Sequence, residues 1–135
     1  MPTGQQQHIL VAEDEEDMGE TLRRALVREG YQITLTRDGL EALCLLRDQP
    51  CDLLITDIRM PRMGGMELLR EIKKLRLALP VILITGFGDR ASFVEGMNLG
   101  AVRFICKPLK IAELVTAVRQ TLREERFSQT SSDDV

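Results

Sequence analysis

The chain has 135 residues, of which 44% are hydrophobic and 29% are charged, and its formal net charge is −3. These values predict one globular domain with a full hydrophobic core. The acidic balance argues against direct nucleic acid binding. No apolar run approaches the roughly 20 residues of a membrane span, and the start MPTGQQQ lacks the features of a signal peptide. We therefore expect a cytoplasmic protein that does not enter a membrane.

The predicted elements alternate between short apolar strands and longer amphipathic helices. Five runs rich in Ile, Val and Leu have the continuous apolar character of strands buried on both faces, at residues 9–12, 33–36, 53–58, 81–85 and 102–106. Helical spacing of apolar residues follows each run, most clearly over 111–122 and most weakly over 89–99, where Gly96 interrupts the helix. The polar ends, residues 1–7 and 125–135, are predicted to be flexible tails around a domain at 8–124.

This pattern is (βα) repeated five times. It predicts a single doubly wound α/β domain, with a five-stranded parallel sheet covered by helices on both faces. In such sheets the working site lies at the carboxyl ends of the strands. The residues that end each apolar run are therefore the first candidates for function.

The cysteines and the single histidine offer no site of their own. Cys44, Cys51 and Cys106 lie in apolar contexts without metal-ligand spacing, which predicts free, buried thiols in a cytosolic protein. His8 precedes the first strand and is expected to be solvated.

Polar residues suited to a metal ion and a phosphoryl group end four of the five predicted strands. In strand order they are Glu13 with Asp14, Asp57, Thr85, and Lys107. Carboxylates bind hard divalent cations, and a hydroxyl and an amine can donate to phosphoryl oxygens. The second strand ends at residues 36–38, which are interpreted as a plain turn.

The acidic run at residues 13–17 divides into two parts. Glu15, Glu16 and Asp17 suit the first turn of a helix, where the helix dipole favours negative charge. The same interpretation is open for Glu13 and Asp14. If Asp57 arrives beside them from another strand, however, the three carboxylates repel one another and a cation relieves the strain.

These motifs resemble the receiver domain of bacterial two-component response regulators. The matching residues, in order, are Glu13-Asp14, Asp57 in LLITDIRMP, the loop MPRMGG, Thr85 in LITG, and Lys107-Pro108. Each motif alone is weak, but all of them in order over residues 8–124 are specific. The resemblance implies a flavodoxin-like strand order 2-1-3-4-5.

The resemblance also implies a signalling switch, rather than a turnover enzyme, for two-component signal transduction or a phosphorelay. Asp57 accepts a phosphoryl group from a phosphohistidine on a sensor histidine kinase or a histidine phosphotransfer protein. Mg²⁺ (or Mn²⁺) is held by Asp14 and Asp57 directly, by Glu13 through water, and by the backbone carbonyl of Arg59. Several retained waters suit the octahedral preference of Mg²⁺.

Other residues receive their roles by the same resemblance. Lys107, turned into the site by a cis peptide with Pro108, pairs with phosphoryl oxygens, and the Thr85 hydroxyl donates to them. Thr85 and Phe104 then reshape the face made by the helix at 89–99, the strand at 102–106 and the helix that begins near 111. Homodimerisation and binding of an unidentified downstream effector are expected through this face. Phe104 also admits a purely structural interpretation, as a core aromatic.

The resemblance also implies that three residues border the phosphoryl group: Arg59, Gly86 and Phe87. A cation at Arg59 and a large ring at Phe87 are expected to alter the lifetime of the acyl phosphate, in a direction that the sequence does not give.

Two rival functions remain. The chain could be a degenerate receiver that acts as a docking module without phosphorylation. A hydrolase of the haloacid dehalogenase type also uses a strand-end Asp, but it needs a second Asp two positions later, where this chain has Arg59.

Overall fold

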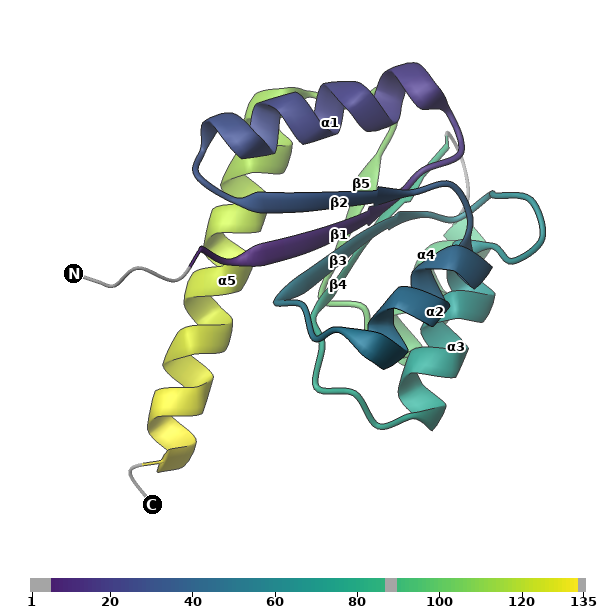
Figure 1. Cartoon of the computed structure of the whole chain (residues 1–135). Helices are drawn as coiled ribbons and strands as arrows, with labels where there is room; N and C mark the ends of the chain where they lie inside the picture. The colour runs from purple at the N-terminus through teal and green to yellow at the C-terminus, as the bar shows by residue number, and fades with distance from the viewer. Residues whose placement is uncertain (1–5, 87–89, 134–135) are drawn as a thin grey trace.

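The predicted α/β fold is confirmed. The computed structural model describes residues 6–86 and 90–133, and within them strands and helices alternate (Figure 1). The strands are β1 (His8–Ala12), β2 (Gln32–Thr36), β3 (Leu53–Asp57), β4 (Val81–Thr85) and β5 (Arg103–Cys106). The helices are α1 (Glu16–Arg28), α2 (Gly39–Asp48), α3 (Gly65–Lys74), α4 (Arg90–Asn98) and α5 (Ile111–Asp133). Every strand pair is parallel, in the order β2-β1-β3-β4-β5.

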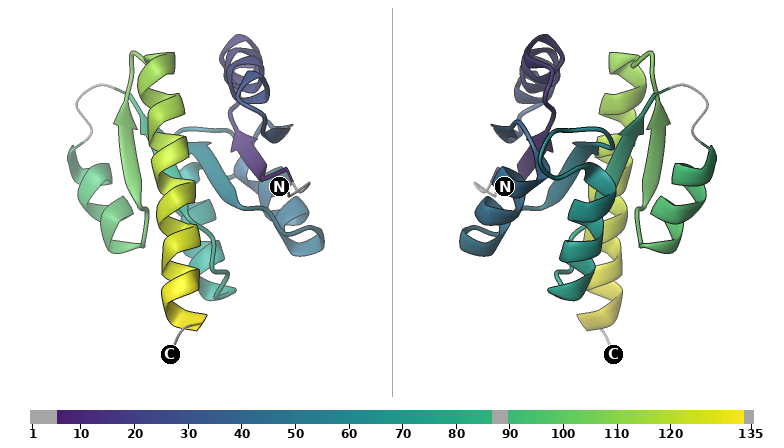
Figure 2. Two further views of the ribbon diagram at one scale, coloured as in Figure 1. Left: turned by 90° about the vertical axis from the view of Figure 1, so that its left-hand side faces the viewer. Right: turned by 90° about the vertical axis from the view of Figure 1, so that its right-hand side faces the viewer.

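Two apolar layers hold the helices on the sheet. Successive strand residues point to opposite faces, so Ile9 and Val11 pack in the layer of α1 and α5, while Leu10 and Ala12 pack in the layer of α2 and α3. Figures 1 and 2 show α1 and α5 on one face of the sheet and α2, α3 and α4 on the other. All residues of β3 and β4 are buried, as their continuous apolar character predicts.

The strand register brings the carboxyl ends to one level. Ala12 pairs with Thr56, and Asp57 pairs with Ile84. Thr85, the next residue of β4, pairs with Cys106. The residues that follow these pairs therefore emerge at one edge of the sheet, where the sequence places the candidate site.

The ends of the domain differ from the prediction. Residues 6 and 7, assigned to a tail, are tied to the domain, because the Gln7 carbonyl accepts a hydrogen bond of 2.9 Å from the Gln32 N–H. Residues 1–5 lie outside the described part. Helix α5 continues past residue 124, where the predicted domain ends, to Asp133 (Figures 1 and 2). No glycine or proline follows Pro108 to end it.

The cysteine and histidine interpretations need correction. The three thiols are free, but Cys44 and Cys106 are exposed and Cys51 is half-buried. Cys44 in α2 and Cys106 in β5 have apolar neighbours in sequence, but these neighbours face the core from other sides of the helix and strand. His8 is half-buried, and its ring shares a hydrogen bond of 2.7 Å with the Thr34 hydroxyl of the neighbouring strand. In the described ranges, none of the helices is long and apolar enough to cross a membrane.

Candidate functional site

Three acids predicted to meet do so at the carboxyl edge of the sheet. Glu13 and Asp14 directly follow β1, and Asp57 is the last residue of the neighbouring strand β3. One carboxylate oxygen from each lies within 4.8 Å of the others. Asp57 and Glu13 are buried and Asp14 is exposed, so the cluster opens to solvent on one side.

Lys107 is the cation of this cluster. Its Nζ donates a hydrogen bond of 2.7 Å to Oδ2 of Asp57, a side chain that is only 6% exposed. The Lys107 N–H donates to the Thr85 carbonyl at 2.8 Å, and the Lys107–Pro108 peptide is cis, as predicted. Burial lowers the pKa of Lys107, but the hydrogen bond and charge of Asp57 outweigh it and raise the pKa overall. The ammonium group therefore stays charged beside Asp57.

The backbone of Arg59 also faces Asp57. Its N–H donates to Oδ1 of Asp57 at 3.1 Å, so each carboxylate oxygen of Asp57 has one donor. The Arg59 side chain is exposed.

Glu13 is the strained member of the cluster. Its Oε2 accepts a hydrogen bond of 3.1 Å from the Glu15 N–H, but its buried Oε1 has no partner among the described residues. Burial, aided by the charge of Asp57, raises the pKa of Glu13 to about 7. A buried acceptor without a partner costs free energy. An unpaired oxygen within a group of three carboxylates therefore fits a hard divalent cation, which takes oxygen ligands directly or through water.

Among the described residues, neither Thr85 nor Phe104 forms a hydrogen bond with Asp57. Thr85 is buried at the end of β4, and its hydroxyl donates a hydrogen bond of 3.3 Å to the Gly86 carbonyl oxygen. Gly86 itself is exposed. Phe104 is half-buried and packs edge to face on Phe93 of α4, with ring centroids 5.0 Å apart. Phe87 falls outside the described residues, so its predicted place beside the phosphoryl group stays a prediction.

The end of β2 is not a plain turn. Asp38 is buried, begins α2 by accepting a hydrogen bond of 2.8 Å from the Glu41 N–H, and forms an ion pair with Arg62 of the β3–α3 loop. The Glu41 N–H holds the pKa of Asp38 below its usual value, and Arg62 adds to this effect. The spacing of Asp38 and Glu41 is that of a capping box, a signal that the sequence contained.

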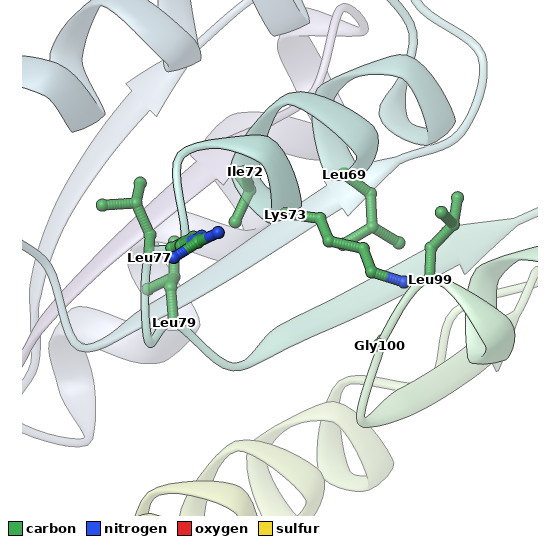
Figure 3. Close-up of a pocket in the computed structure, with 8 residues that line it drawn as sticks. Leu69, Ile72, Lys73, Leu77, Leu79, Leu99 and Gly100 are labelled. Atoms are coloured by element: carbon green, nitrogen blue, oxygen red, sulfur yellow. The ribbon is translucent and has the colours of Figure 1, made fainter.

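A separate hollow of about 360 Å³ lies at the C-terminal end of α3 (Figure 3). Because α3 runs back from the carboxyl edge of the sheet, this hollow lies away from the acids. It is lined by Leu69, Ile72, Lys73, Arg76, Leu77, Leu79, Leu99 and Gly100. None of these belongs to the acidic cluster.

Residues 9–119 match the model of the response regulator receiver domain. The chain belongs to this family. The receiver domain is 34% identical over 128 residues to the uncharacterized transcriptional regulatory protein YkoG of Bacillus subtilis, with 95% of this chain and 55% of that protein covered. It is 32% identical over 126 residues to response regulator MprA of Mycobacterium ulcerans, covering 93% and 54% of the two chains.

Solved structures agree with this assignment. A CheY-like response regulator receiver domain from Methanospirillum hungatei superposes with a TM-score of 0.88 at 27% identity, covering 92% of this chain and 99% of that one. The chain spans about half the length of the curated relatives it matches. The chain is thus a response regulator receiver domain of the kind used in two-component signalling.

Proposed function

We propose that this receiver domain accepts a phosphoryl group on Asp57 in a Mg²⁺-dependent reaction. The observation that carries the proposal is the position of Lys107, whose ammonium group donates to the buried Asp57 carboxylate beside an unpaired oxygen of Glu13. A nucleophilic carboxylate, a fixed cation and a set of metal ligands are the parts that phosphoryl transfer to an aspartate requires.

In the proposed step an Asp57 oxygen attacks the phosphorus of a phosphohistidine on a histidine kinase or a histidine phosphotransfer protein. The P–O bond forms as the P–N bond breaks, and the electron pair of that bond returns to the imidazole nitrogen. Lys107 then donates to a phosphoryl oxygen. Its charge, already fixed at the edge of the sheet, offsets the negative charge that gathers there.

The metal ion is assigned to the same edge. Asp14 and Asp57 would bind it directly, Glu13 through water, and the loop through the Arg59 carbonyl. Bound Mg²⁺ would supply charge neutralisation between the two anions that react. The exposed side of the cluster at Asp14 leaves room for the waters that Mg²⁺ retains.

The output of the reaction is a change on the face of α4, β5 and α5. The Thr85 hydroxyl would leave the Gly86 carbonyl for the phosphoryl group, and Phe104 would change its rotamer. Because Phe104 packs on Phe93, this movement would disturb α4. Helix α4 carries exposed apolar side chains at Phe93, Val94 and Met97, and the α4–β5–α5 face is our candidate surface for a homodimer or an effector protein.

In this proposal the receiver domain acts as a switch without steady turnover. It catalyses its own phosphorylation and the slow hydrolysis of the acyl phosphate. The exposed Arg59 side chain sets the lifetime of that acyl phosphate. Measuring autodephosphorylation of the wild type and of Arg59→Asn tests this last point, and equal rates would refute it.

Intact mass spectrometry tests the whole proposal. The domain is incubated with a small phosphodonor, with Mg²⁺ or with EDTA. We expect one added phosphoryl group in Mg²⁺ only, its loss in Asp57→Asn, and its retention in Asp48→Asn, a control at an exposed carboxylate. No adduct with any donor would favour the docking module, and steady turnover of phosphate esters would favour the hydrolase.

A further inference from the structure

Residues 36–39, at the end of β2, hold the two loops that flank the acidic cluster. On one side the Glu13 N–H donates to the Thr36 carbonyl at 2.9 Å. On the other side the Gly39 N–H donates to the Met63 carbonyl in the β3–α3 loop at 2.7 Å. This one segment therefore connects the loop of Glu13 to the β3–α3 loop, which follows Asp57.

The contact with the β3–α3 loop is close and partly charged. A Cβ on Gly39 would lie 2.6 Å from the Met63 carbonyl oxygen, so only glycine allows this approach. Beside it, Oδ2 of Asp38 accepts a hydrogen bond of 2.8 Å from Nε of Arg62, and a second, shorter one from the same guanidinium. The Asp38 side chain is 3% exposed, and its other oxygen caps α2. The acceptor is therefore fixed in place.

Arg62 adopts a conformation that arginine does not favour. Its φ of 65° lies in the left-handed region, which glycine adopts readily and which is strained for a residue with a Cβ. The backbone alone thus gives no reason for arginine at this position. The paired hydrogen bonds to Asp38 give one, because they tie the middle of the loop to a buried point.

We propose that the Asp38–Arg62 ion pair positions the β3–α3 loop (residues 58–64) against the Glu13 loop and thereby sets the affinity for Mg²⁺. The inference rests on the metal site of the proposed function, since that loop carries the Arg59 carbonyl. Arg62 is a positioning residue that acts through the backbone. A pair that served only as surface charge would leave Mg²⁺ affinity unchanged, because exposed ion pairs contribute little.

Calorimetric titration with Mg²⁺ tests the inference on the whole chain. Arg62→Gly removes the guanidinium and also removes the backbone strain of a side chain at positive φ. Asp38→Asn removes the negative charge that pairs with Arg62 but retains a good N-cap for α2. We expect each to weaken Mg²⁺ binding about tenfold, the lower end of the range for groups that orient metal ligands. The double variant should bind as weakly as either single variant, because both remove the same interaction.

Arg76→Gly is the matched control. Arg76 is the other non-glycine residue with positive φ in the described structure, at 56°, and it lies at the far end of α3. It should gain thermal stability with unchanged Mg²⁺ affinity. If Arg62→Gly binds Mg²⁺ as the wild type does, the inference is wrong while the proposed function stands. If the wild type binds no Mg²⁺, both fall.

Discussion

The ammonium group of Lys107 lies 2.7 Å from a carboxylate oxygen of Asp57, although 50 positions separate the two residues in the chain. The pair forms because β5 and β3 end at the same edge of the sheet on either side of β4. Lys107 is thus both the cation that offsets the carboxylate cluster and, in the proposed reaction, a ligand of the phosphoryl group.

Replacing Lys107 should separate these two roles. In Lys107→Met the cluster loses its cation, so Mg²⁺ should bind more tightly, because one positive charge no longer opposes the metal. Phosphorylation by a small donor should slow on the order of a hundredfold, because a fixed donor to the phosphoryl group is gone. Calorimetry and the rate of mass increase measure the two effects. A fall in both would mean that Lys107 mainly maintains the structure.

Mg²⁺ should stabilise the folded domain, because it binds the folded state and not the unfolded state. At about a hundred times its Kd, Mg²⁺ should raise the melting temperature by on the order of 10 °C. Asp14→Asn should reduce this rise, because it removes an exposed carboxylate of the cluster. Scanning calorimetry in Mg²⁺ and in EDTA gives the comparison. An equal rise in Asp14→Asn would show that Asp14 is not a ligand.

The stability of the metal-free domain should depend on the protonation of Glu13. Its pKa is raised from 4.5 to about 7 by burial, so the folded state binds the proton more tightly than the unfolded state. The contribution of Glu13 to stability is therefore present at pH values below 4.5 and is lost as pH rises to about 7. This loss is on the order of 1–3 kcal/mol.

Urea unfolding in EDTA at several pH values measures this effect. Glu13→Gln, a neutral side chain of the same shape, should lack this part of the pH dependence and should be the more stable protein at pH 7.5. Parallel pH profiles for the two proteins would contradict the raised pKa.

Gly96 should resist substitution despite its position inside α4. A Cβ there would lie 2.5 Å from Cδ1 of the fully buried Leu83. Gly96→Ala should therefore destabilise the domain by about 1–3 kcal/mol, although alanine is the better helix former. Val94→Ala, at an exposed position of the same helix, should change stability by less than about 0.5 kcal/mol. Chemical denaturation measures both, and a stabilised Gly96→Ala would show that α4 can move away from the sheet.

The fold and the acidic cluster were predictable because their signals are local and periodic. Continuous apolar runs predict β3 and β4, which are buried throughout. Because parallel strands end at one edge of the sheet, the sequence also predicts that Glu13 and Asp57 lie close together, as they do. The cis Lys107–Pro108 peptide followed only from the family resemblance, since composition and spacing do not determine a peptide isomer.

What the sequence did not predict depends on contacts between distant segments. The pairing of Asp38 with Arg62 requires two loops to meet, so residues 36–38 looked like a plain turn. In the sequence Gly96 only weakens a predicted helix. The contact with Leu83, which leaves no room for a Cβ, depends on how α4 packs on β4. The exposure of Cys44 and Cys106 depends on which side of an element each residue occupies.

Phosphorylation of Asp57 is best tested by identifying the residue that carries the phosphoryl group. After treatment with a small phosphodonor and Mg²⁺, borohydride reduces an aspartyl phosphate to homoserine, which peptide mass spectrometry locates. We expect homoserine at position 57 alone, and none when Mg²⁺ is replaced by EDTA. A phosphoryl group on another residue, or homoserine at any other position, would contradict it.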